Sequence, residues 1–308
     1  MDKSSSPFAG DLQTDDHDHD RGLAFDLVTA EALNRRRALR VFGLAGGSLA
    51  LAACGGDETA SASASTATAT PTPSASATPT PTPTATASSG ATCTAFASET
   101  NGPYPADGTN TSNGSTSNVL TLTSFQRSDI RASVGTGAVA PGVPVTVTLR
   151  VVDVNNSCAA LAGYAVYLWH CDAVGDYSLY DTPNESWLRG IQITDANGQV
   201  TFTTIFPGCY AGRYPHMHFE LFTSLANATG GRYARLISQI AMPADECAAV
   251  YADTATYGAS GARFANTSIA TDGIFRDNSA AQQGAMILAL SGSAAAGYTA
   301  SATVGIAT

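Results

Sequence analysis

The chain has 308 residues, 44% of them hydrophobic, and a formal net charge of −10. This length and composition predict a globular domain with additional segments. After residue 54 there is no lysine, and nine arginines stand against seventeen acidic residues. That balance disfavours nucleic-acid binding, and the missing lysine excludes Schiff-base chemistry and the lysine-bearing phosphate loop.

The first 53 residues resemble an export signal. Arginines at 35–37 precede a short, weakly apolar stretch from Val41 to Ala53, which resembles a twin-arginine signal and is too short to span a bilayer in a mature protein. The stretch ends in Leu51–Cys54, which resembles a bacterial lipoprotein box in which Cys54 becomes the acylated N-terminus. We therefore expect export and lipid anchoring to the outer face of the cell membrane or cell envelope. The alternative is an uncleaved, buried apolar helix.

Residues 54–90 are predicted to be a disordered tether. After Cys54 the segment consists almost wholly of Ser, Ala, Thr and Pro. It cannot bury enough apolar surface to offset the entropy lost on ordering. The folded domain is therefore predicted to span 91–308.

Five cysteines follow the tether, at Cys93, Cys158, Cys171, Cys209 and Cys247. In an exported protein they indicate disulfides more than zinc thiolates. An odd number allows two bridges and one free thiol, and the sequence leaves their pairing open.

The hydrophobic pattern of the domain indicates strands. Side chains from Val145 to Val151 alternate between apolar and polar, which is typical of a half-buried strand. Further short β-rich runs are expected at 164–169, 200–205, 216–222 and 236–240, with a turn at Asn197-Gly198. We predict an all-β domain, a single antiparallel β-sandwich with long loops.

The His-x-His unit at His216 and His218 is the first candidate site. On a strand these two side chains project from one face, with Met217 on the other. Two adjacent imidazoles can bind one metal ion, although an isolated pair is more often hydrogen-bonded or at the surface. The remaining histidine after the tether is His170. We expect it to pack in the core or to contact a metal ligand without binding the metal itself.

Two tyrosines favour the metal interpretation. Tyr177 follows a glycine loop, and Tyr210 follows Pro207-Gly208 just before the histidine strand. A trivalent hard cation can hold tyrosine as phenolate. Two phenolates and two imidazoles suit Fe(III) and lack the carboxylate expected of an Fe(II) oxygenase.

Four motifs between Glu99 and Asp277 resemble the intradiol ring-cleavage dioxygenases, the family of catechol 1,2-dioxygenase and protocatechuate 3,4-dioxygenase. They are Trp169-His170 with Gly175-x-Tyr177-Ser178, Arg189-Gly190-x-Gln192-x-Thr194-Asp195, Phe206-Pro207-Gly208-x-Tyr210 with Arg213-x-x-His216-x-His218, and Thr271–Phe275. A segment beginning at Glu99 also resembles the family's opening motif, although Asn101 stands where Glu is usual. That departure bears on substrate preference or on the local loop.

The resemblance implies one non-haem Fe(III) ion per chain, with the metal ligands Tyr177, Tyr210, His216 and His218. Tyr210 would be the axial phenolate displaced by substrate. Arg213 would stabilise charge on the substrate ring, and Gln239 would lie near that ring. The implied reaction is cleavage of a small aromatic diol by O2 to a cis,cis-muconate-type diacid. The chain has no counterpart of the long helical dimerisation segment of some relatives, which favours a monomer.

Three alternatives remain open at this point. The chain could be an exported β-sandwich lipoprotein that binds iron or aromatic ligands without catalysis. It could hold structural zinc through Cys171, Cys209, His216 and His218, although their spacing does not match common zinc patterns. It could also be a structural surface lipoprotein without metal.

Overall fold

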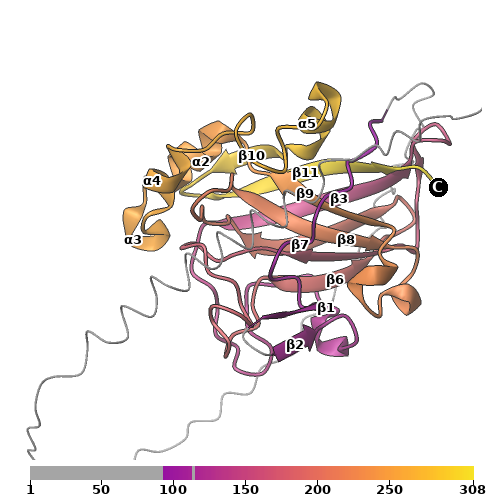
Figure 1. Cartoon of the computed structure of the whole chain (residues 1–308), viewed down its shortest axis with the longest axis horizontal. Coiled ribbons are helices and arrows are strands. Elements are labelled where there is room, and N and C mark those ends of the chain that lie inside the picture. Colours follow the sequence, from indigo (N-terminus) through magenta and orange to yellow (C-terminus); the bar gives the residue numbers. More distant parts are fainter. Residues whose placement is uncertain (1–92, 113–114) are drawn as a thin grey trace, which may run out of the picture.

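The computed structural model describes residues 93–112 and 115–308. The predicted signal region 1–53, the predicted acylation site Cys54 and the whole predicted tether up to residue 90 lie outside these residues. The described part consists mostly of strands with a few short helices, as predicted (Figure 1). None of its helices has the length and apolar character needed to cross a bilayer.

A five-stranded sheet forms one layer of the domain. Its order is β10-β11-β3-β4, and β7 pairs with the other edge of β3. The strands are β3 (Pro144–Asp153), β4 (Ala159–Ala160), β7 (Gln199–Ile205), β10 (Ala289–Ser293) and β11 (Gly297–Ile306). In β3 the alternation predicted from sequence holds, since Val145, Val147 and Leu149 are buried and the residues between them are partly exposed.

A four-stranded sheet forms the second layer, in the order β6-β5-β8-β9 with every pairing antiparallel. Its strands are β5 (Ala165–Trp169), β6 (Arg189–Ile193), β8 (His216–Phe222) and β9 (Leu236–Ala241). One face of it shares a single hydrophobic cluster with the five-stranded sheet, in which Leu168, Met217 and Phe219 join Leu149 and Phe202. The two sheets therefore bury one core between them.

The prediction of a wholly antiparallel arrangement is wrong for one pairing. Strand β11 runs parallel to β3, with Tyr298 opposite Val145 and Ile306 opposite Asp153. The sequence signal for β11 is weak because the strand is rich in Ala, Ser and Thr, and its partner lies about half the chain away. Parallel pairing needs a long connection, here the whole chain between the two strands.

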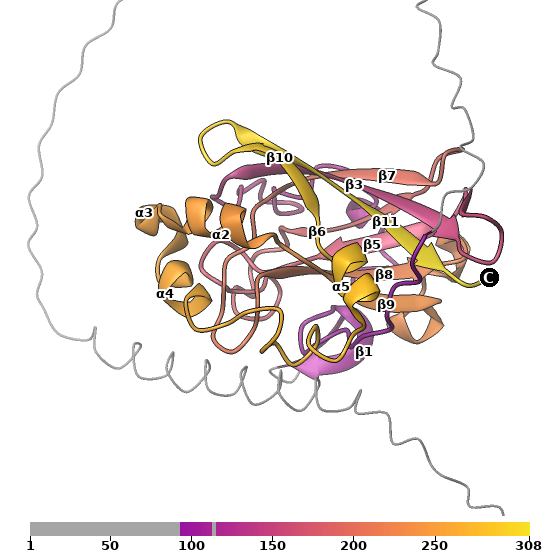
Figure 2. The same ribbon diagram turned by 90° about the horizontal axis from the view of Figure 1, so that it is seen from above.

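The remaining elements lie at the margins of the sheets. The hairpin of β1 (Asp107–Ser112) and β2 (Ser115–Asn118) lies at the lower edge of the view in Figure 1, and β1 contacts the short helix at Gly231–Tyr233. Seen from above, helices gather at one end of the molecule (Figure 2). They are α2 (Ala244–Tyr251), α3 (Thr254–Tyr257) and α4 (Ser260–Phe264), whereas α5 (Ala280–Met286) contacts β9 and β11.

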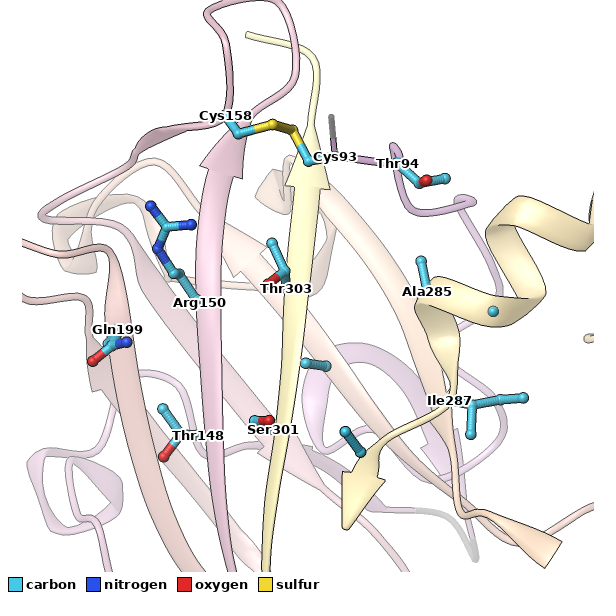
Figure 3. Close-up of a pocket in the computed structure, with 13 residues that line it drawn as sticks. Cys93, Thr94, Thr148, Arg150, Cys158, Gln199, Ala285, Ile287, Ser301 and Thr303 are labelled. Carbon is cyan, nitrogen blue, oxygen red and sulfur yellow. A yellow bond between two sulfur atoms is a disulfide. The ribbon is translucent and has the colours of Figure 1, made fainter. Parts of the chain in front are cut away.

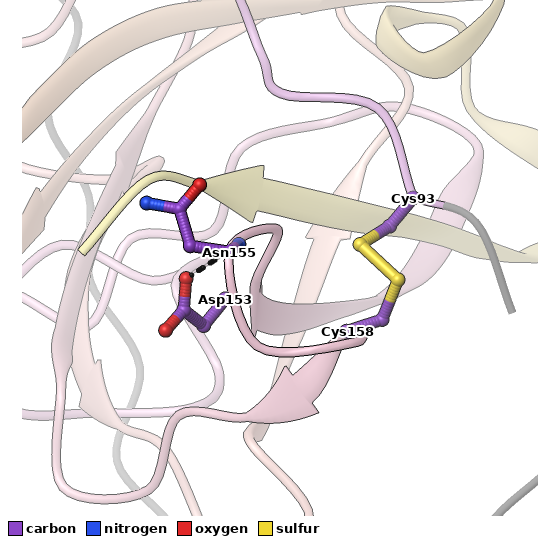
Figure 4. Close-up of a disulfide and its surroundings, with 4 residues drawn as sticks. All are labelled: Cys93, Asp153, Asn155 and Cys158. Atoms are coloured by element: carbon purple, nitrogen blue, oxygen red, sulfur yellow. Dashed lines mark hydrogen bonds between the residues drawn. A yellow bond between two sulfur atoms is a disulfide. The ribbon is translucent and has the colours of Figure 1, made fainter. Parts of the chain in front are cut away.

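One disulfide forms, between Cys93 and Cys158, with a Cα–Cα distance of 5.9 Å (Figure 4). It ties the first described residue to the turn after β3. Cys171, Cys209 and Cys247 are free and buried. The five cysteines of the described part thus form one bridge, where their number allowed two.

A groove of about 530 Å³ lies on the outer face of the five-stranded sheet, beside this disulfide (Figure 3). Polar side chains from β3, β7 and β11 line it, among them Arg150, Gln199 and Thr303. None of the predicted site residues reaches it, since these lie on or over the other sheet.

Candidate active site

The two predicted histidines project from the same face of β8. His216 and His218 are each 2% exposed, and their Nε2 atoms lie 3.0 Å apart. Met217 points the opposite way into the core between the sheets. The two-residue period of a strand is sufficient to bring the imidazoles together.

Both predicted tyrosines reach these imidazoles. The hydroxyl of Tyr210 lies 3.2 Å from Nε2 of His216, and the hydroxyl of Tyr177 lies 3.2 Å from Nε2 of His218. Tyr177 comes from the loop between β5 and β6, and Tyr210 from the segment between β7 and β8. Two loops and one strand thus bring two oxygens and two nitrogens to a common point.

Glycine allows the two tyrosine loops to approach each other. A Cβ at Gly208 would stand 2.4 Å from the carbonyl oxygen of Ala173. A Cβ at Gly175, where φ is +95°, would stand 3.0 Å from the Cβ of Tyr210. A larger residue at either position would push the loops apart. The Gly-x-Tyr spacing of both motifs therefore has a steric reason.

Each imidazole has its own support. Nδ1 of His216 lies 2.6 Å from the carbonyl oxygen of Tyr214. A carbonyl only accepts hydrogen bonds, so Nδ1 carries the proton and Nε2 keeps its lone pair. The ring of His218 stacks on Trp169, with centroids 5.0 Å apart and planes 8° from parallel. Its Nδ1 has no hydrogen-bond partner among the described residues.

Burial keeps both imidazoles neutral. It lowers the pKa of His216 to about 3, with the positive charge of Arg213 acting in the same direction. The pKa of His218 is also held well below its usual range, first by burial and then by His216. Burial raises the pKa of Tyr177 well above its usual range. Two neutral imidazoles therefore face two tyrosine hydroxyls, and that of Tyr177 would ionise only beside a strong positive charge.

Arg213 and Gln239 form a buried polar chain beside this cluster. Nη2 of Arg213 donates to Oε1 of Gln239 at 2.5 Å, and Nε2 of Gln239 donates to the carbonyl of Thr100 at 3.0 Å. Gln239 on β9 lies directly opposite His218 in the sheet. The structure therefore brings both predicted side chains next to the four clustered ones.

Asp272 balances the charge of Arg213. The two form an ion pair of 3.0 Å, and both side chains are fully buried. Burial alone would raise the pKa of Asp272, but Arg213 and the N–H of Tyr214 bring it below its usual range. Although Asp272 lies in a motif that the sequence singled out, its role as partner of Arg213 depends on a contact 59 residues away.

The other candidates lie apart from the cluster. His170 is buried between the hydroxyl of Thr204 and the carbonyl of Cys171, at 2.6 and 2.7 Å. Asn101 donates to Asp107 and Thr109 on the nearby strand β1. No group of three or more His, Cys, Asp or Glu residues in 93–112 and 115–308 is placed to hold a metal ion. The zinc set of Cys171, Cys209 and the two histidines is therefore not assembled.

A model of the family described as "Dioxygenase" matches residues 117–256. This segment holds β3 to β9, both predicted tyrosines, both histidines and Arg213. The matched segment is a dioxygenase domain. The chain therefore has an oxidoreductase domain of the dioxygenase family, in agreement with the resemblance that the motifs predicted.

Several solved structures are similar to this dioxygenase. An intradiol ring-cleavage dioxygenase from Tetranychus urticae has 26% identity and a TM-score of 0.49, covering 60% of this chain and 88% of that one. The dioxygenase domain of a dioxygenase carbohydrate-binding protein fusion from Streptomyces sp. SirexAA-E has 20% identity and a TM-score of 0.43, with coverages of 70% and 99%. Catechol 1,2-dioxygenase from Pseudomonas arvilla C-1 has 21% identity and a TM-score of 0.36, with coverages of 58% and 55%. No curated protein sequence matches the chain.

Proposed function

We propose that this dioxygenase cleaves catechol-type aromatic diols between their hydroxyl-bearing carbons, using Fe(III) and O2, to give cis,cis-muconate-type diacids. The observation that carries the proposal is the convergence of Tyr177, Tyr210, His216 and His218. Their donor atoms are spaced at 3.0 to 3.2 Å in a buried cluster. The dioxygenase family match supports the reaction class.

The four side chains fit a ferric ion. The two Nε2 atoms lie 3.0 Å apart, close enough for one ion to contact both. His216 directs a lone pair at His218, an arrangement that a shared cation would stabilise. Phenol oxygens complete a hard oxygen and nitrogen set, and a trivalent cation would hold them as phenolates.

The residues around the cluster support a division of roles. Tyr177, Tyr210, His216 and His218 would hold the ion, which when bound supplies the Lewis acidity that makes the diol reactive toward O2. Tyr210 is the most exposed of the four, at 8%, which suits the ligand that a substrate would displace.

Arg213 would stabilise negative charge that develops on the substrate ring. The ion pair with Asp272 and the hydrogen bond to Gln239 hold its guanidinium in one orientation. Gln239 would thereby contribute to the wall of the substrate site.

An oxygen electrode tests the proposal on the purified full chain loaded with ferric iron. We expect a visible tyrosinate-to-iron absorption band that shifts on adding catechol, together with oxygen uptake in a screen of about a dozen diols. Tyr210→Phe should lose most of the uptake. Tyr251→Phe is the matched control, since its hydroxyl is also buried but donates to Pro207 outside the cluster. Colour without uptake for any diol would instead favour a non-catalytic iron-binding or aromatic-binding lipoprotein.

We further propose that the two sheets form a β-sandwich domain exported on a lipid anchor at Cys54, with 54–90 as its tether. The shared hydrophobic core supports the sandwich. The disulfide between Cys93 and Cys158 supports an oxidising compartment. Labelling cells with a radioactive fatty acid would test the anchor: the full chain should incorporate label, and Cys54→Ala should not. We expect a monomer, which the mass of the detergent-solubilised chain would check.

A further inference from the structure

Arg189 is a fully buried arginine with no carboxylate partner in 93–112 or 115–308. It begins β6, and its donors are satisfied by neutral groups. Nε donates to the hydroxyl of Ser178 at 3.0 Å and Nη2 to the carbonyl of Ser178 at 2.9 Å. Nη1 donates to the carbonyl of Pro105 and to the hydroxyl of Tyr167, both at 3.2 Å.

Burying an unpaired charge costs free energy unless hydrogen bonds replace the lost water. Here the planar guanidinium uses its fork of donors on four acceptors, and it lies over the ring of Tyr180 with 5.5 Å to the centroid. A lysine has a single ammonium and cannot make this set of bonds. The position therefore requires arginine for its geometry.

The residue tied down most firmly is Ser178, the neighbour of Tyr177. The carbonyl of Tyr177 accepts the N–H groups of Tyr180, Asp181 and Thr182, which closes a tight turn. Within that turn Leu179 has a φ of +67°, a strained conformation for a residue with a side chain. A turn that contains such strain needs contacts from outside to persist.

Arg189 supplies those contacts from the sheet that carries the histidines. Arg189 on β6, Trp169 on β5 and His218 on β8 lie opposite one another in register, so they form one row across the sheet. Trp169 stacks on His218 at one end of the row, and Arg189 bonds to Ser178 at the other. The row thus links the backbone next to Tyr177 to the strand that carries His218.

We propose that Arg189 is a positioning residue that fixes the 177–182 turn against the four-stranded sheet, so that the Tyr177 oxygen stands at His218 before any metal binds. The assignment of Tyr177 as a ligand rests on the proposed function. The role of Arg189 in fixing the turn is independent of that function.

The test compares Arg189→Met with Arg127→Met in the full chain. Arg127 is a matched control because its guanidinium also donates to backbone carbonyls, those of Ser186, Arg189 and Ala132, and lies over the ring of Phe125. It does not contact the 177–182 turn. Amide hydrogen exchange of the metal-free proteins is measured first, followed by ferric iron titration and resonance Raman spectra of the tyrosinate modes.

We expect Arg189→Met to speed exchange at the amides of residues 180–182 by at least about tenfold relative to Arg127→Met. We also expect it to weaken ferric iron binding by about 10- to 100-fold, the usual range for residues that support metal ligands, and to weaken the Raman modes of one tyrosinate. Arg189→Lys keeps the charge and should recover little of the loss. If Arg189→Met does not fold, Ser178→Ala, which removes one acceptor, should show a smaller change in exchange at the same amides.

Unchanged exchange at these amides in a folded Arg189→Met or Ser178→Ala protein would overturn the proposal. Full recovery by Arg189→Lys would overturn it too, because charge alone would then suffice. A wild-type protein that binds no ferric iron would refute the proposed function instead, and the exchange comparison would still decide the role of Arg189.

Discussion

The two faces of β8 are built from one alternating sequence but serve opposite purposes. Met217, Phe219 and Leu221 point into the core shared by both sheets. His216 and His218 point the other way, toward loops that carry tyrosines. The first face gains stability by burying apolar surface, whereas the second buries polar groups that contribute to stability only when they find partners. A single strand can thus hold a site rigidly because its reverse side is packed.

The largest expected effect comes from a substitution on the core-facing side of β8. Phe219 is 1% exposed and its ring contacts Phe96 edge-on, with centroids 5.8 Å apart. Phe219→Ala should lower the free energy of unfolding by about 3–5 kcal/mol. Urea denaturation followed by circular dichroism measures this loss. Iron bound per folded molecule should stay as in wild type, and a folded variant that binds no iron would show that the two faces are not independent.

The next effect concerns the side of β8 that carries His216 and His218, toward which Tyr177 points. Tyr177→Phe removes one oxygen and keeps the ring, so ferric iron affinity should fall by about 100-fold or more, which corresponds to about 2.7 kcal/mol. The free energy of unfolding of the metal-free protein should change by no more than about 1 kcal/mol. Iron titration with optical detection and urea denaturation separate the two quantities. Tyr257→Phe, whose hydroxyl donates to Phe206 outside the cluster, serves as control, and equal iron affinity in both variants would contradict the assignment.

The smallest expected effect is on the pH dependence of stability and comes from Glu99. Burial raises the pKa of its carboxyl to about 7 from an ordinary value of 4.5, although a hydrogen bond from Asn278 opposes the shift. Between these values the native state holds a proton that the unfolded chain has released, so the free energy of unfolding decreases as the pH rises through this window.

Glu99→Gln stays neutral and should remove part of this decrease. The difference in free energy of unfolding between the variant and wild type should shift by about 1 kcal/mol in favour of the variant from about pH 4.5 to pH 8. This value allows for the partial exposure of the carboxyl. Urea midpoints at the two pH values measure the gain. Glu246→Gln on α2 is the control, and identical pH profiles of Glu99→Gln and wild type would refute the shift.

The sequence alone was enough for the strands with strong alternation and for the side chains that meet on one strand. Strand β8 occupies the predicted residues 216–222, and β3 contains the whole alternating run from Val145 to Val151. His216 and His218 had to share a face because the period of a strand is two. The motifs also identified the dioxygenase family, which the family match confirms.

The tertiary structure alone decided which distant segments meet. Strand β11 pairs in parallel with β3 because burial between β10 and β3 outweighs its weak strand signal. Among the cysteines at 93–308, Cys93 and Cys158 alone form a disulfide, a pairing that no spacing rule could reveal. Arg189 and Asp272 stood in recognisable motifs, but their partners Ser178 and Arg213 lie 11 and 59 residues away. Local periodicity depends on neighbouring residues, whereas the partners of buried charges depend on how the whole chain packs.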